Sequence, residues 1–118
     1  MGRVLTDTLT NEVVTTIKND TITDFPIEFT LSQNYPNPFN STTPIKYYLP
    51  LAGHVKLIVY NLLCQEIKTL INRNHDAGWF SLVWNGRNNS GQMVLLGVYF
   101  YWIQAEGFSE TKKMLLMQ

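Results

Sequence analysis

The chain has 118 residues and carries nine basic and nine acidic side chains, so its formal net charge is zero. Hydrophobic residues make up 45% of it and charged residues 15%, which argues against disorder and provides for one packed domain. The balanced charge argues against a nucleic-acid-binding protein. No apolar run approaches the roughly 18 residues that span a bilayer. Composition therefore predicts a soluble, non-membrane-spanning domain and no particular chemistry.

The amino-acid usage changes near residue 25. Residues 3–24 are rich in Thr, Asn and Asp and contain neither proline nor aromatic residues. Because Thr and Val favour extended backbone, we interpret residues 1–24 as an extended linker or N-terminal arm. All five prolines and all aromatic residues lie from Phe25 onward, so residues 25–118 are expected to form the domain. The first residues lack the pattern of a secretory signal, so we expect any export address to lie elsewhere.

The first expected strands are short and end at proline. The segment 29–31 is stopped by residues 34–38, where two prolines at a spacing of two exclude a central strand. A second strand, 45–49, ends at Pro50. Residues 55–60 alternate after a turn at Ala52-Gly53, and 67–71 is a further strand candidate.

The second half of the chain continues this pattern. Residues 80–84 alternate, and a glycine-containing loop, 85–91, follows them. The segment 97–103 is apolar on both faces, as in a central strand, and a turn at Glu106-Gly107 leads into 111–117. About seven strands with no helical period predict an all-β, immunoglobulin-like antiparallel β-sandwich. Its alternation predicts burial of Leu57, Val59, Leu82, Trp84, Tyr99 and Tyr101.

Residues that could carry chemistry are few and scattered. His54 and His75 lie in predicted turns, without a second ligand at a metal-like spacing, and are expected to be solvated. Cys64 is the single cysteine, which excludes an intrachain disulfide, and we expect an inert thiol. The carboxylates form no pair suited to acid–base catalysis. We therefore predict no catalytic residues, no metal, no cofactor and no enzymatic activity.

The aromatic residues and the N-terminal arm each suggest a possible function. Trp79 and Trp102 are the aromatic side chains most expected to face solvent. If they share one face, the domain is an accessory carbohydrate-binding module. Alternatively, residues 3–24 add as a strand to a neighbour's sheet, which allows self-association through the N-terminal arm in a structural subunit of an extracellular assembly.

One segment carries a family resemblance: Gln33, Asn34, Tyr35, Pro36, Asn37, Pro38, Phe39 and Asn40. It resembles the opening signature of the type A C-terminal sorting domain of the type IX secretion system. Four later blocks, within 55–66, 77–87, 97–101 and 111–116, are similar to that family's blocks and follow its order. The later blocks alone also fit the immunoglobulin-like domain of flagellar hook-capping proteins, whereas the signature favours the sorting domain.

The chain departs from the family's usual pattern at four positions. Cys64 stands where the family usually has Gly, and Ser41 where Pro is common. Leu96 replaces a small residue and Trp102 replaces Arg. These differences put local turn geometry and surface character in doubt rather than the resemblance.

The resemblance implies a non-catalytic secretion signal at the C-terminus of an exported protein. Such domains direct cargo from the periplasm through an outer-membrane translocon to the cell surface, where a sortase commonly removes them. The implied partners are therefore the outer-membrane secretion translocon and the surface sortase, and the implied location is secreted or cell-surface. The candidate residues for translocon recognition are Thr111, Lys112, Lys113 and Met114.

Overall fold

The structure is a computed structural model that describes residues 28–118. The expected linker at 1–24 and the boundary at residue 25 lie outside the described residues. All the regular elements of the described range are strands: β2 (Thr30–Leu31), β3 (Phe39–Asn40), β4 (Thr43–Leu49), β5 (Gly53–Tyr60), β6 (Glu66–His75), β7 (Gly78–Trp84), β8 (Gly97–Ala105) and β9 (Phe108–Met117). Within residues 28–118 no helix is long and apolar enough to cross a membrane.

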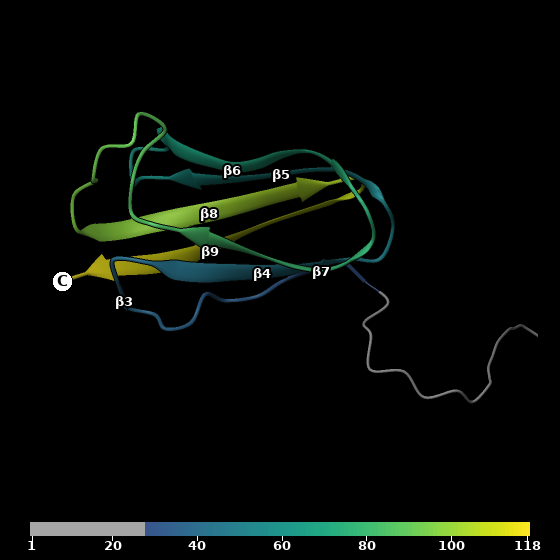
Figure 1. The fold of residues 1–118 in the computed structure, drawn as a ribbon, viewed down its shortest axis with the longest axis horizontal. Helices are drawn as coiled ribbons and strands as arrows, with labels where there is room; N and C mark the ends of the chain where they lie inside the picture. The colour runs from purple at the N-terminus through teal and green to yellow at the C-terminus, as the bar shows by residue number, and fades with distance from the viewer. Residues whose placement is uncertain (1–27) are drawn as a thin grey trace, which may run out of the picture.

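The strands form two sheets that enclose the core (Figure 1). The smaller sheet has the order β2-β4-β7 and the larger sheet the order β3-β9-β8-β5-β6. The predicted all-β sandwich is therefore confirmed, and β8 is an internal strand as its apolar faces predict. Among the described strands, the one parallel pairing joins β3 to β9. Strand β3 was not predicted, because two residues between a proline and a turn offer no alternation to detect.

Trp84, the last residue of β7, is fully buried in the core. Its ring meets Tyr99 edge-on at 5.2 Å and lies 5.9 Å from Phe39, measured between ring centroids. Its indole Nε1–H donates to the Arg87 carbonyl at 2.9 Å, so the polar end of the ring is also satisfied.

Five of the six side chains that alternation predicts to be buried are buried: Leu57, Val59, Trp84, Tyr99 and Tyr101. The prediction is wrong for Leu82, which is only half-buried against the core. The reason is its position on β7, an edge strand of the three-stranded sheet that has a neighbour on one side only.

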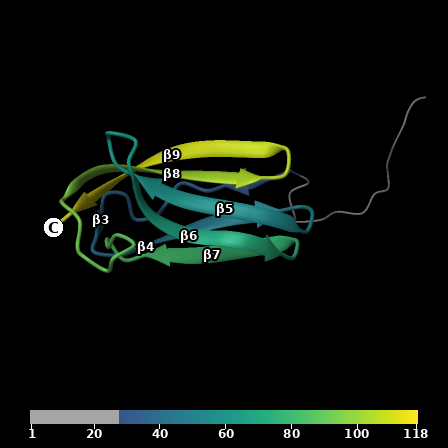
Figure 2. The same ribbon diagram turned by 90° about the horizontal axis from the view of Figure 1, so that it is seen from above.

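The two ends of the sandwich differ in what they hold. At the end we call the N-terminal pole, the described chain begins and the Phe29 ring stacks on Phe108 at 5.2 Å. The opposite end, the C-terminal pole, holds the turn 61–65, the loop 85–96 and the C-terminus (Figures 1 and 2). The first described residue therefore lies at the end of the sandwich remote from the C-terminus (Figure 1).

Two of the departures from the family pattern have a backbone explanation. Cys64 has a φ of 63°, in the left-handed region that favours glycine, which is the family's usual residue at this position. Ser41 has a φ of 68°, whereas the proline ring holds φ near −65°. The turn at Cys64 thus keeps a backbone suited to glycine, and the turn at Ser41 has a backbone that proline cannot adopt.

Candidate functional site

The signature segment Gln33–Asn40 lies along the outer edge of β9, the last strand. The Gln33 side chain donates from Nε2 to the Lys113 carbonyl at 2.7 Å, and the Leu115 N–H donates to Asn37 Oδ1 at 2.9 Å. Further along, β3 pairs directly with the end of β9. An edge strand leaves backbone donors and acceptors unpaired, and the signature supplies partners for this part of the edge.

Asn34 fastens the start of the signature to the core and is only 2% exposed. Its backbone N–H donates to the Tyr101 hydroxyl at 2.8 Å, and that hydroxyl donates to the Ser32 carbonyl at 2.6 Å. Its side-chain Nδ2 donates to Thr43 Oγ1 at 3.1 Å and to the Pro36 carbonyl at 3.2 Å. These bonds satisfy a buried amide and connect the two sheets.

Burial also changes the acidity of the Tyr101 phenol. Removal of the hydroxyl from water raises the pKa of Tyr101 to about 12. The hydrogen bond from the Asn34 N–H acts in the opposite direction, and the nearby Glu110 carboxylate adds to the increase in pKa. The phenol is therefore neutral at physiological pH and can both donate and accept.

The signature residues divide into two groups by the contacts that their side chains make. Phe39 is 1% exposed and packs on Trp84, so together with Gln33, Asn34 and Asn37 it holds the fold. The other four, Tyr35, Pro36, Pro38 and Asn40, are exposed. Among them Tyr35 presents a large aromatic ring that is 83% exposed.

The four candidate recognition residues do not share one environment. Strand alternation places Thr111 and Lys113 on the outer face of the larger sheet, and both are exposed. Lys112 points the other way and its Nζ lies 3.1 Å from the Glu110 carboxylate. Met114 is fully buried in the core. Met114 is therefore a packing residue and leaves the set of candidate contacts.

Trp79 and Trp102 lie on opposite outer faces of the sandwich. Trp79 belongs to β7 of the smaller sheet, is 48% exposed and packs beside Tyr48 with ring centroids 5.1 Å apart. Trp102 belongs to β8 of the larger sheet and is half-buried. The condition for a sugar platform made by these two residues, one shared face, is not met.

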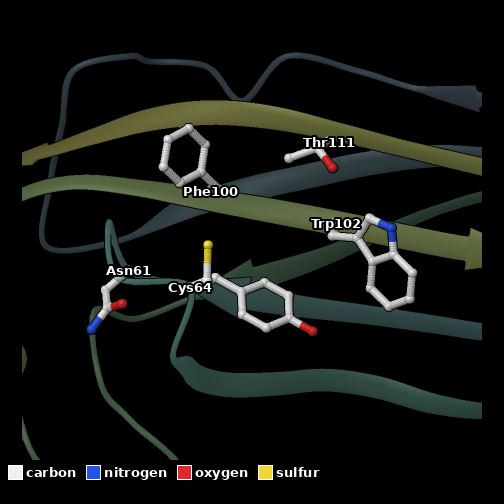
Figure 3. A pocket seen from close by; sticks show the side chains of 6 residues that line it. Asn61, Cys64, Phe100, Trp102 and Thr111 are labelled. Atoms are coloured by element: carbon white, nitrogen blue, oxygen red, sulfur yellow. The ribbon is translucent and has the colours of Figure 1, made fainter.

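Trp102 instead lines a shallow groove of about 450 Å³ on the larger sheet. Figure 3 shows its lining, which consists of Tyr60, Asn61, Cys64, Phe100, Trp102 and Thr111. Tyr60 lies opposite Phe100 in the register of β5 and β8, which explains why three aromatic rings gather here. Sequence reasoning missed Tyr60 and Phe100 as partners of Trp102. The sequence shows that Tyr60 and Phe100 alternate with apolar neighbours, but it does not show that β5 pairs with β8.

The two histidines lie in strands, which corrects their assignment to turns. His54, in β5, is exposed, and its ring nitrogens lie 2.7 Å from Asn72 Oδ1 and 3.1 Å from Asn74 Oδ1. His75, at the end of β6, is half-buried and its Nδ1 lies 2.9 Å from the Asp76 carbonyl. A carbonyl can only accept, so Nδ1 carries the hydrogen in this contact. In the neutral ring Nε2 is then the acceptor for the Tyr47 hydroxyl, 3.0 Å away.

The residues 28–118 hold no cluster of three or more His, Cys, Asp or Glu side chains that could bind a metal ion. Cys64 is exposed on the turn 61–65. The candidate site is the surface where the exposed side chains of the signature segment adjoin those of β9 along the edge of the larger sheet.

The chain matches no family model and no curated protein. Among solved structures it is similar to dimeric latent PorU from Porphyromonas gingivalis, with a TM-score of 0.60 at 13% identity over 88% of this chain. It is also similar to FLGD from P. aeruginosa, with a TM-score of 0.50 at 25% identity over 63% of this chain and 60% of that one. The chain spans only 10% of the length of PorU.

A further similarity is to PorZ, described as an essential bacterial surface component of the type-IX secretion system of P. gingivalis. It has a TM-score of 0.48 at 17% identity, over 73% of this chain and 11% of PorZ. That TM-score is too low to carry an argument. The similarity to PorU, at 13% identity, establishes the sandwich fold alone.

Proposed function

We propose that this domain is a non-catalytic sorting domain that directs an exported protein through the type IX translocon to the cell surface. The observation that carries the proposal is the match between signature and structure. Gln33, Asn37 and Phe39 of the signature bond to or pair with β9. Asn34 joins the signature to Tyr101 of the larger sheet and Thr43 of the smaller sheet. The signature thus coincides with a structural unit, which a chance sequence match does not require.

The fold comparison supports the proposal independently of the signature. The domain superposes on a part of PorU that amounts to one tenth of that protein. The described part of the chain is a compact module of this size, and the signature lies along the edge of its last strand, β9 (Figure 1). The similarity to FLGD shows that a similar sandwich occurs in another protein, so the fold by itself does not fix the function.

The recognition surface that we assign to the translocon combines residues of the signature and of β9. Tyr35 and Lys113 belong to segments that the Gln33–Lys113 hydrogen bond joins, and both are exposed. Exposed tyrosines are enriched among the residues that dominate protein contacts, and Lys113 adds a positive charge on the neighbouring segment. Thr111 extends this surface on the same face of β9 as Lys113.

Export of a reporter tests the proposal. Residues 25–118 are fused to a reporter that carries a signal peptide and expressed in a bacterium with a type IX translocon. We expect the reporter at the cell surface, and in the periplasm of an otherwise identical strain without the translocon. A fusion that folds and remains periplasmic in both strains contradicts the proposed function.

A further inference from the structure

The C-terminal pole exposes an unusual concentration of large apolar side chains. Six of them are about half to four-fifths exposed: Leu62 65%, Leu63 77%, Met93 74%, Leu95 84%, Leu96 56% and Met117 47%. They come from the turn 61–65, the loop 85–96 and the end of β9, which Figures 1 and 2 place at the same end of the sandwich. Exposed apolar patches of several hundred Å² typically mark interaction sites.

The pole has both a hollow and a projection. The hollow, of about 590 Å³, lies between the end of β9 and the loop 85–96. Its lining includes Met93, Leu95, Leu96 and Met117 together with the polar segment 40–42. The projection is the Leu62–Leu63 pair at the tip of the turn between β5 and β6.

Both features are held by hydrogen bonds. In the turn, Asn61 Oδ1 accepts from the N–H groups of Leu63 at 2.9 Å and Gln65 at 3.0 Å. In the loop, the Asn89 N–H donates to the Ile67 carbonyl at 2.9 Å, which fastens the loop to β6. The apolar side chains are therefore displayed by ordered backbone, which reduces the entropy that a partner must overcome on binding.

We propose that the C-terminal pole is a self-association surface, on which two copies meet end to end about a two-fold axis. In this arrangement the Leu62–Leu63 projection of each copy enters the hollow of the other. A two-fold interface requires one patch to be complementary to itself, and a projection beside a hollow meets that requirement.

Three observations favour a second copy as the occupant. The chain has no net charge, so two copies do not repel each other through net charge. An interface of standard size buries about 800 Å² on each partner, and somewhat more than half of that area is apolar. The six exposed apolar side chains of the C-terminal pole supply an apolar area of that order. The described chain begins at the other pole, so its first residue does not lie at the contact in either copy (Figure 2).

Sedimentation velocity on the full 118-residue chain tests this self-association. The experiment runs with reductant, since Cys64 is exposed, from about 1 µM to about 1 mM, the range of transient interfaces. We expect a monomer that becomes a dimer with increasing concentration. Leu63→Glu and Leu95→Glu should each weaken the dimer at least about tenfold, because each places a charge in the apolar contact.

Leu51→Glu is the matched control, because Leu51 is 70% exposed at the N-terminal pole beside Phe29 and Phe108. It should leave the dimer unchanged, and circular dichroism confirms that all three variants stay folded. A chain that is monomeric at every concentration overturns the proposal, as does a dimer that Leu51→Glu weakens as much as Leu95→Glu. Binding of the pole only to a different protein also overturns it. The result does not depend on the proposed sorting role.

Discussion

Gln33 and Lys113 lie 80 residues apart in the chain and are joined by a 2.7 Å hydrogen bond from the Gln33 side chain to the Lys113 carbonyl. This bond links the signature to the segment in which recognition residues were expected. The signature supports the last strand from the side that β8 leaves open. The side chains of the signature, amides spaced by prolines, therefore serve largely to cover the edge of β9.

Gln33→Ala is predicted to lower the free energy of unfolding by about 1 kcal/mol, the usual net value of one hydrogen bond. Asn37→Ala should cost a similar amount, because it removes the acceptor for the Leu115 N–H. Urea unfolding measures both. The control is Gln104→Ala, on the exposed outer face of β8, which should stay within about 0.5 kcal/mol of the parent. Equal effects of Gln33→Ala and Gln104→Ala would show that the edge bond does not stabilise β9.

Asn34→Ala is predicted to cost about 2 kcal/mol, because it leaves the fully buried Thr43 hydroxyl without this partner. The matched control is Asn40→Ala, an exposed Asn of the same signature. It should change the free energy of unfolding by less than about 0.5 kcal/mol. The account of the buried amide fails if the two variants unfold at the same urea concentration.

Stability should decrease in alkaline solution because of Tyr101. Its folded pKa is about 12 against an ordinary value of 10.0, so the unfolded chain loses this proton first as pH rises. The contribution is complete below pH 10 and is lost between pH 10 and pH 12, on the order of 2–3 kcal/mol. Urea unfolding at about pH 8 and about pH 12 measures the decrease.

The control for the alkaline effect is Tyr101→Phe. This variant should start less stable by about 1–2 kcal/mol, since it loses the hydroxyl bonds to Ser32 and Asn34. It should also lose less stability in alkali than the parent. Burial raises the pKa of Tyr47 and Tyr99 too, so part of the decrease should remain. An identical alkaline decrease in Tyr101→Phe would assign the effect to other groups.

Cys64→Gly is predicted to stabilise the domain by about 1 kcal/mol, because a left-handed backbone strains residues that have a Cβ. Ser41→Pro should destabilise it by more than that amount, since proline cannot adopt a φ of 68°. Thermal unfolding measures both changes. A destabilised Cys64→Gly variant would mean that the thiol makes a contact worth more than the strain.

The class of fold and most of the core follow from local patterns. Alternation with a period of two identifies Leu57, Val59 and Tyr101 because each faces the opposite sheet. It fails for Leu82, because burial on β7 depends on that strand being an edge, which only the order of strands reveals. Strand β6 extends to His75, beyond the expected end at Ile71. The sequence did not predict this extension, because the last residues of the strand are polar and show no apolar period.

The candidate site was less predictable than the core. Tyr35 and Lys113 could each be singled out in the sequence, but their proximity depends on contacts between segments 80 residues apart. The separation of Trp79 from Trp102 likewise depends on which sheet each strand joins. Local sequence identifies the residues of such a surface, and only the topology shows which of them share a face.

The most direct test of the central claim measures how much reporter reaches the cell surface when the assigned surface is altered on a folded domain. The variant is Tyr35→Ala with Lys113→Gln, in the fusion of residues 25–118. The matched control is Trp79→Ala with Lys46→Gln, an exposed aromatic and lysine on the smaller sheet. With thermal midpoints recorded for both, we predict at least about a tenfold loss of surface reporter for the first and near-parental export for the second. Parental export by a folded Tyr35→Ala, Lys113→Gln domain would contradict the assignment of this surface to the translocon.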